Sequence, residues 1–185
     1  MNTKTMFSSR NDTWETPQDF FDKLDDIFHF DIDVCATADN AKCSVYYTPE
    51  DDGLQKTWKG TCWCNPPYGR NIREWIKKAY ETAKSETGTV VCLIPSRTDT
   101  KYWHDYVMKA TGIFFVRGRL KFGNSKNSAP FPSAVVVFKK GAVPEEWLNR
   151  DDNVMVNSPA ALNACAVKGF YRDVQLIAKR MGDKA

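Results

Sequence analysis

The uninterrupted apolar run from Thr89 to Ile94 constrains the fold of this chain more than any other segment. A run without polar alternation indicates a strand buried on both faces, which is typical of the centre of a sheet covered by helices. Shorter runs with strand character occur elsewhere in the chain. We expect further strands over residues 29–33, 42–48, 61–64, 113–116 and 133–138.

Helical spacing of apolar residues separates several of these strands. Thr16-Pro17 predicts the start of a first helix, with Thr16 as N-cap and Pro17 as the first helical residue. Asn71 and Glu74 predict a capping box for a second helix, and a third is expected over residues 102–109. Strands that alternate with helices indicate an α/β fold with a mostly parallel sheet and helices on both faces.

Two parts of the chain depart from this alternation. No helical period lies between the last two expected strands, so we expect them to form an antiparallel pair. We predict a flexible tail over residues 1–12 and one domain over residues 13–140. Residues 141–185 are expected to form a helical extension packed on that domain, with a helix over residues 158–180.

Composition and charge limit the class of protein. The polar start lacks the apolar core of a signal peptide, and no apolar run approaches the length of a membrane span, so we expect a soluble, cytoplasmic protein. The six cysteines form no metal-ligand spacing, and reduced thiols without a metal site are expected. Residues 1–64 hold six Lys/Arg against twelve Asp/Glu, whereas residues 65–185 hold twenty against eleven. A basic second half is compatible with a phosphate-binding surface, or with ordinary solvated surface.

The tetrapeptide Asn65-Pro66-Pro67-Tyr68 follows one expected strand and precedes a helix. Open α/β sheets bind ligands at the edge formed by the carboxyl ends of their strands. Two successive prolines give a rigid turn that lacks backbone N–H groups, so its carbonyls and the Asn65 side-chain oxygen can act as fixed acceptors. Such acceptors beside an aromatic ring suit a planar amine with two N–H donors. These four residues alone are equally compatible with a stiffened loop.

Acidic residues lie near the ends of other strands. Asp33 occupies the usual position of a nucleotide-cofactor contact, although no glycine-rich phosphate loop is present. A carboxylate there can hold an ammonium group instead. The acidic turn over residues 50–52 is within reach of a ribose or an adenine amine, and Asp52, next to Gly53, is its favoured member.

Basic and aromatic residues gather in the second half of the chain. The loop from Arg117 to Lys126 combines cations with an aromatic ring, which is the pattern of nucleic-acid binding. Arg97 follows the apolar strand at the same expected edge, where its segment either positions substrate or caps a helix. The expected DNA contacts are Arg97, Arg117, Arg119, Lys121, Phe122 and Lys126.

Together these segments resemble the phage-type, Dam-like DNA adenine-N6 methyltransferases. The resemblance covers residues 14–138 in the expected order and leaves residues 141–185 uncovered. The matching segments are Trp14-Glu-Thr-Pro17, Asp31-Ile-Asp-Val-Cys-Ala36, Asp52-Gly-Leu54 with Trp58, Asn65-Pro-Pro-Tyr-Gly69, Pro95-Ser-Arg-Thr-Asp-Thr100 and Gly118-Arg-Leu-Lys-Phe122. It implies a Rossmann-like methyltransferase fold, S-adenosylmethionine as cofactor, DNA as partner and protection from restriction as one biological role.

The resemblance also implies roles for particular residues. Asn65, Pro66, Pro67 and Tyr68 would hold the target adenine, with Tyr68 stacked on a flipped-out base. Residues from two segments would hold the cofactor: Trp14, Thr16 and Pro17, then Asp33 with Cys35 and Ala36. In one respect the chain departs from the family, because the loop over residues 35–41 contains no glycine.

Amine chemistry leaves related activities open. Cytosine-N4 methylation uses a similar acceptor pair, and protein glutamine methylation also grips a planar amide. Cytosine-C5 methylation requires a cysteine nucleophile, usually after a proline, and no cysteine here follows a proline. A non-catalytic DNA-binding module would not explain a rigid acceptor pair. The basic loop favours nucleic acid over protein as the substrate.

Overall fold

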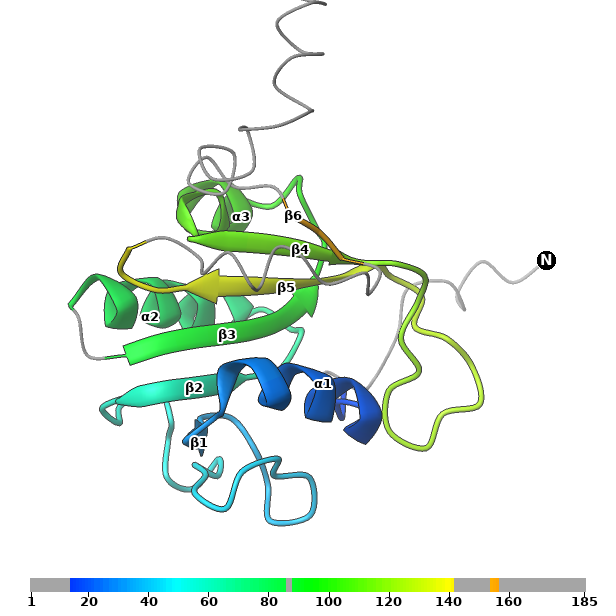
Figure 1. Ribbon diagram of the computed structural model, residues 1–185, viewed down its shortest axis with the longest axis horizontal. Coiled ribbons are helices and arrows are strands. Elements are labelled where there is room, and N and C mark those ends of the chain that lie inside the picture. The colour runs from blue at the N-terminus through cyan, green and yellow to red at the C-terminus, as the bar shows by residue number, and fades with distance from the viewer. Residues whose placement is uncertain (1–13, 86–87, 142–153, 157–185) are drawn as a thin grey trace, which may run out of the picture.

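Six strands form one mixed sheet in the order β1-β2-β3-β5-β4-β6 (Figure 1). The computed structural model describes residues 14–85, 88–141 and, as a backbone strand, 154–156. The strands are β1 (Ile32–Asp33), β2 (Gly60–Cys64), β3 (Gly88–Pro95), β4 (Gly112–Val116), β5 (Ser133–Phe138) and β6 (Val154–Val156). The apolar run at residues 89–94 is thus the core of β3, as predicted.

The directions of the strands explain where a ligand site can form. β1, β2 and β3 are parallel neighbours, and β5 runs antiparallel to both β3 and β4. β4 therefore points the same way as β1–β3, and four of the six strands share one direction. This confirms an α/β fold with mostly parallel strands and an antiparallel pair β4–β5. The carboxyl ends of β1–β4 lie at one edge of the sheet.

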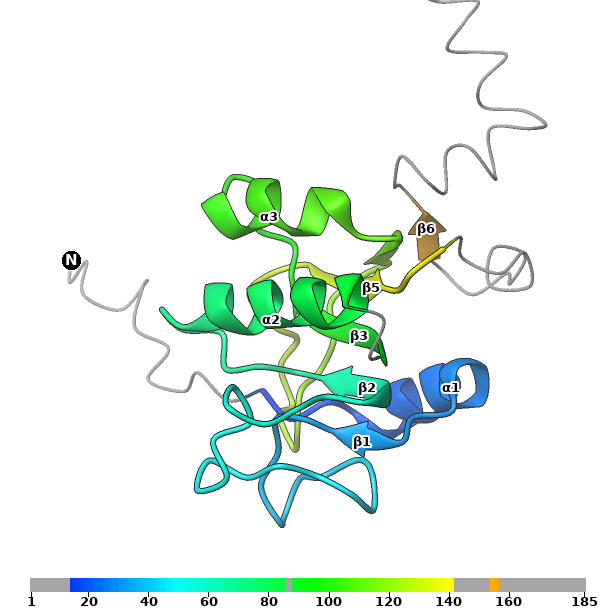
Figure 2. The same ribbon diagram turned by 90° about the vertical axis from the view of Figure 1, so that its left-hand side faces the viewer.

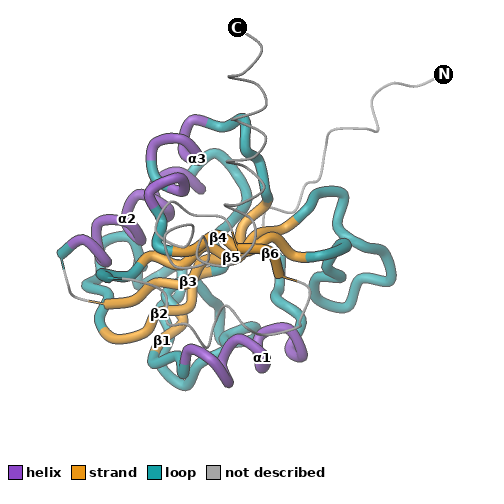
Figure 3. The backbone as a smooth tube through the Cα atoms, turned by 45° about the horizontal axis from the view of Figure 1, so that its top comes forward, coloured by secondary structure: helices purple, strands orange, loops and turns teal. Residues whose placement is uncertain are grey.

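Helices cover both faces of the sheet (Figures 2 and 3). Helix α1 (Gln18–Phe28) lies on one face, where Phe21 contacts Trp63 of β2 with ring centroids 5.4 Å apart. Helices α2 (Ile72–Lys84) and α3 (Lys101–Asp105) lie on the other face. Because both faces are covered, the side chains of Val90 to Ile94 have no solvent exposure.

The expected helix over residues 102–109 is divided into two pieces. Helix α3 ends at Asp105, and a 3-10 turn follows over Val107–Lys109. Tyr106 separates them with φ −130° and ψ −50°, which lies outside the α-helical range. Apolar spacing does not distinguish a continuous helix from two shorter turns that bury the same side chains.

The predicted N-cap of α1 is wrong, whereas Asn71 occupies the N-cap position of α2 as predicted but without the expected side-chain bonds. Pro17, rather than Thr16, occupies the N-cap position of α1. The Thr16 hydroxyl accepts a hydrogen bond from the Asn65 amide instead. Asn71 precedes α2 with helical backbone angles, and its side chain makes no capping hydrogen bond. The Glu74 N–H is bonded instead by the Asn71 backbone carbonyl at 3.0 Å, so the expected capping box does not form.

Two expectations about strands are also corrected. Residues 42–48 form only an isolated bridge between Tyr46 and Asp33, because this segment turns to cap the Asp33 carboxylate at its start. Strand β6 lies inside the extension for which helix was expected. The predicted tail over residues 1–12 and the predicted helix over residues 158–180 lie outside the described residues. In the described part of the chain, no helix has the length and apolar character to cross a membrane.

Candidate active site

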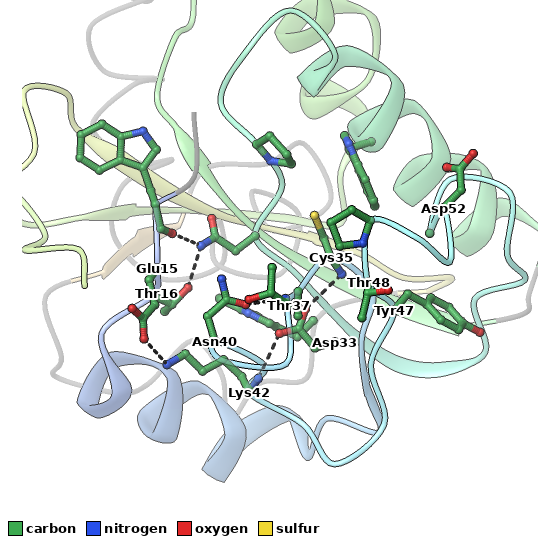
Figure 4. A pocket seen from close by; sticks show the side chains of 18 residues that line it. Glu15, Thr16, Asp33, Cys35, Thr37, Asn40, Lys42, Tyr47, Thr48 and Asp52 are labelled. Atoms are coloured by element: carbon green, nitrogen blue, oxygen red, sulfur yellow. Dashed lines mark hydrogen bonds and ion pairs between the residues drawn. The ribbon is translucent and has the colours of Figure 1, made fainter. Parts of the chain in front are cut away.

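A cleft opens where β1 and β2 end (Figure 4). Its interior volume is about 180 Å³, or about 790 Å³ when the open space at its mouth is counted. Asn65 and Pro67 line it together with six of the residues expected to hold the cofactor. These six are Trp14, Thr16, Asp33, Cys35, Ala36 and Asp52; Pro17 is not among the lining residues.

Asp33 is the most deeply buried charge of the cleft, with 2% of its surface exposed. Its carboxylate accepts backbone N–H bonds from Cys35 at 3.2 Å and from Lys42 at 3.1 Å. Burial raises the pKa of Asp33 from 3.8 to about 6, although these two hydrogen bonds and the Lys42 charge oppose the rise. Asp33 is therefore a carboxylate at neutral pH in a site that favours a cationic ligand.

A pair of opposite charges, Lys42 and Glu15, lies beside Asp33 in the cleft (Figure 4). The Lys42 ammonium lies 3.8 Å from the Glu15 carboxylate and donates to Gln18 Oε1 at 3.0 Å. The Lys42 side chain is only 7% exposed, and both Lys42 and Glu15 line the cleft. Sequence reasoning missed this pair because its members come from separate loops, with no spacing signal to connect them.

A close backbone contact forms the wall near Asp52. A Cβ atom on Gly53 would lie 2.4 Å from the Val34 carbonyl oxygen, so only glycine allows the loop to approach the end of β1 this closely. The Trp58 indole N–H donates to the Gly53 carbonyl at 2.8 Å and holds the loop there. Asp52 itself is exposed and has φ +50°.

The Asn65 side chain is held at both ends. Its amide nitrogen donates to the Trp14 carbonyl oxygen and, at 2.9 Å, to the Thr16 hydroxyl. Its oxygen accepts a hydrogen bond from the Tyr68 hydroxyl at 2.8 Å. Trp14 and Thr16, which line the cleft, thus also contact the tetrapeptide through Asn65.

Tyr68 and Phe122 lie in an aromatic cluster. Tyr68 is 7% exposed and Phe122 is 4% exposed. Tyr68 contacts Phe131 and Phe122 edge to face at 5.5 Å and 6.1 Å, and Trp14 contacts both phenylalanines. Stacking of Tyr68 on a base would thus require these rings to move, and Phe122, expected among the DNA contacts, is a packing residue in this conformation.

The remaining basic residues keep the expected surface position. Arg117, Arg119, Lys121 and Lys126 are exposed on the loop that leaves β4, and Arg97 is exposed just after β3. The loop leaves the sheet at the same edge as the cleft. The Gly123 N–H donates to the Glu15 carbonyl at 2.8 Å, which attaches the loop to the N-terminal segment.

A charged cleft at the carboxyl ends of parallel strands, next to a rigid acceptor turn, places the protein among the α/β enzymes that bind a small ligand at this edge. Comparison with known proteins identifies the family within this class of enzymes. Residues 2–159 match the family model described as DNA N-6-adenine-methyltransferase (Dam). The chain belongs to this family, and the predicted resemblance is confirmed.

Individual relatives come mainly from phages. A DNA N-6-adenine-methyltransferase of Haemophilus phage HP1 is 33% identical over 129 residues, which cover 68% of this chain and 72% of the phage protein. A putative methyltransferase of Escherichia coli K12, YfdM, is 40% identical over 65 residues, covering 31% of this chain and 71% of that protein. A DNA N-6-adenine-methyltransferase of Escherichia phage T1 is 27% identical over 112 residues, covering 59% and 46% respectively.

Proposed function

We propose that this protein transfers a methyl group from S-adenosylmethionine to the N6 amine of adenine in DNA, with the target base flipped out of the duplex. The observation that carries the proposal is the position of Asn65, whose side chain lies in the same cleft as Asp33 and Trp14. Family membership supports the reaction, and the cleft supports a ligand beside the acceptor turn. Residues 13–140 would form the catalytic domain, with the sheet as a Rossmann-like methyltransferase core.

The charges of the cleft fit the proposed cofactor. S-adenosylmethionine carries a sulfonium and an ammonium against one carboxylate, so it is a net cation at neutral pH. Three carboxylates line the cleft, from Glu15, Asp33 and Asp52, against the single ammonium of Lys42. Trp14, Trp63 and Trp75 add aromatic surface to the same cleft, suited to an adenine ring. When bound, the cofactor supplies an electrophilic methyl group.

The tetrapeptide would raise the reactivity of the target amine. The lone pair of an adenine amine is delocalised into the ring, so this nitrogen is a poor nucleophile. Hydrogen bonds from its two N–H groups to the Asn65 oxygen and the Pro66 carbonyl would favour a tetrahedral nitrogen. They would also stabilise the positive charge that develops there. The protein otherwise aligns the methyl group with the nitrogen. Transfer would break the methyl–sulfur bond and release the neutral thioether S-adenosylhomocysteine, and the methylated nitrogen would lose one proton to water, so no covalent intermediate or metal is required.

DNA would bind over the edge at which the cleft opens. A base within a duplex is not accessible to an acceptor pair in a cleft, so the target must rotate out of the helix. The cations of the 117–126 loop, with Arg97, are exposed and would hold phosphates at that edge. This feature favours DNA over a protein glutamine. Cytosine-N4 is the second candidate base, because the same acceptor pair fits its amine.

A labelling experiment tests the activity and the substrate class together. The full chain is incubated with S-adenosylmethionine labelled in its methyl group and separately with DNA, RNA and protein. We expect label in DNA alone, and digestion to nucleosides should yield N6-methyladenine. Label in N4-methylcytosine would support the second candidate, and label in protein or RNA would contradict the proposal.

The pKa of Asp33 predicts how cofactor affinity depends on pH. Because this pKa is raised to about 6, the carboxylate takes up a proton below pH 6 and loses its attraction for a cation. We expect the affinity for S-adenosylmethionine to be constant above pH 7 and to fall by about tenfold per pH unit below 6. Calorimetric titrations between pH 5 and 8 measure this.

The control for this prediction is the stability of the ligand-free protein at each pH, which shows whether weaker binding reflects unfolding. Asp33 binds a proton more tightly in the folded protein than in the unfolded chain, so its contribution to stability increases as pH falls from about 6 to 4. Weak binding at pH 5 would therefore not reflect unfolding driven by Asp33. If the affinity does not change between pH 5 and 8, the Asp33 carboxylate does not bind the cation of the cofactor.

A further inference from the structure

We propose that Thr16 and the backbone carbonyl of Trp14 are positioning groups that fix the orientation of the Asn65 amide, so that its oxygen and not its nitrogen faces the target amine. This inference rests on the proposed function, because it gives Asn65 the role of an acceptor. It adds a requirement that residues outside the tetrapeptide must meet, namely a fixed orientation of the Asn65 amide. An Asn in this turn acts as an acceptor only if its amide is held one way round.

The Trp14 carbonyl decides between the two orientations. A carbonyl oxygen has no hydrogen to donate, so the Asn65 atom that contacts it must be the amide nitrogen. The Thr16 hydroxyl lies 2.9 Å from the same nitrogen, and Thr16 is only 3% exposed. Both N–H groups of the amide therefore have acceptors, and rotating the amide by 180° would place two oxygens against each other.

The opposite end of the amide is consequently oxygen. This oxygen accepts from the Tyr68 hydroxyl at 2.8 Å. The Tyr68 hydroxyl has a second acceptor, the Leu93 carbonyl, at 3.2 Å. Its single hydrogen can move to Leu93 when an amine reaches Asn65, so the buried Tyr68 hydroxyl still has an acceptor after it releases Asn65.

The same geometry explains why the position suits an amide better than a carboxylate. In the variant Asn65→Asp, an ionised side chain would place a carboxylate oxygen against the Trp14 carbonyl, where Asn65 places an N–H. The protonated form of the same variant would restore the arrangement, because its O–H can donate to Trp14 while its other oxygen remains an acceptor. Partial burial of this position and the facing carbonyl both favour the protonated form and raise the pKa of such a carboxyl.

The first test compares Thr16→Val with Thr16→Ser. Valine keeps the shape of threonine and removes the acceptor, whereas serine keeps the hydroxyl. We expect Thr16→Val to lower kcat about tenfold or more, with the KM for DNA changed less than about threefold, and Thr16→Ser to recover most of kcat. Rates are normalised to the fraction of protein that binds S-adenosylhomocysteine, so partial misfolding does not affect the comparison.

The second test is the pH profile of Asn65→Asp. We expect this variant to be nearly inactive at pH 8.5 and to gain activity as pH falls toward 6.5, relative to the unmodified protein at each pH. Other ionisable groups facing the cleft are common to both proteins, so only the ratio of the profiles is interpreted. These groups are Glu15, Asp33, Cys35, Lys42, Tyr47 and Asp52, with Tyr68 beside Asn65.

Failure of this inference is distinct from failure of the proposed function. Absence of any methyl transfer to DNA by the unmodified protein would contradict the function itself, whereas full transfer by Asn65→Ala would contradict only the acceptor role of Asn65. If Asn65→Ala is inactive while Thr16→Val has an unchanged kcat, Thr16 has no positioning role. A ratio of Asn65→Asp to unmodified activity that does not change with pH would overturn the orientation argument.

Discussion

We expect Asn65→Ala to reduce methyl transfer to DNA by about 10²–10³-fold or more while leaving the affinity for S-adenosylmethionine nearly unchanged. Removal of a single preorganised group that stabilises developing charge has effects of this size. Asn65 provides that group, and its truncation also removes a hydrogen-bond partner of Tyr68. The separate carboxylates of the cleft remain, so the cation of the cofactor keeps its partners. Transfer of label to a DNA duplex and calorimetric binding measure the two quantities.

Asn71→Ala is the matched control for this variant. Asn71 lies six positions later, is exposed and makes no side-chain capping bond to α2. The same substitution there should leave both transfer and binding unchanged. If Asn65→Ala reduced cofactor affinity in proportion to activity, Asn65 would be a cofactor contact and not an acceptor for the target amine.

The second large effect concerns the 117–126 loop. We expect the triple variant Arg119→Gln, Lys121→Gln and Lys126→Gln to weaken DNA binding about 10²-fold or more near 0.1 M salt. The logarithmic salt dependence of binding should fall by about 0.9 for each phosphate that the variant no longer neutralises, or by about 2.7 in all. Cofactor affinity should not change, because none of these residues lines the cleft. Fluorescence anisotropy of a labelled duplex at several salt concentrations measures both values.

A charge-matched control lies at the opposite edge of the sheet. Lys59 precedes β2, Lys84 ends α2 and Lys140 follows β5. Their triple replacement by Gln removes the same charge far from the cleft and should change the salt dependence little. An equal reduction in both triple variants would show that DNA binding follows net charge and not the loop.

Local patterns predicted the framework of the fold. The apolar run in β3 and the helical stripe of α2 were predicted correctly because each reports burial of neighbouring side chains along one element. The antiparallel β4–β5 pair followed from a missing helical period. No pattern predicted β6, since a strand of three residues with polar neighbours carries too little periodicity.

The residues of the cleft were predicted to different extents. Asp33 ends a segment of alternating polarity and Asn65 follows an apolar run directly, and these positions at strand ends indicated an edge site. Lys42 and Glu15 carried no such signal, because their contact depends on how two loops fold toward each other. Thr16 was predicted as a helix cap, and its bond to a residue 49 positions away was not predictable from local chemistry.

The insertion of β5 between β3 and β4 determines when the sheet can be completed during synthesis. β3 pairs along its length with β5, from Val90 opposite Phe138 to Pro95 opposite Ser133. Until Phe138 has left the ribosome, one edge of the apolar strand β3 has no partner. β4 also has no partner, because both of its neighbours in the finished sheet, β5 and β6, follow it in the chain. Chaperones or rapid translation through residues 96–138 would limit aggregation at this edge during that interval.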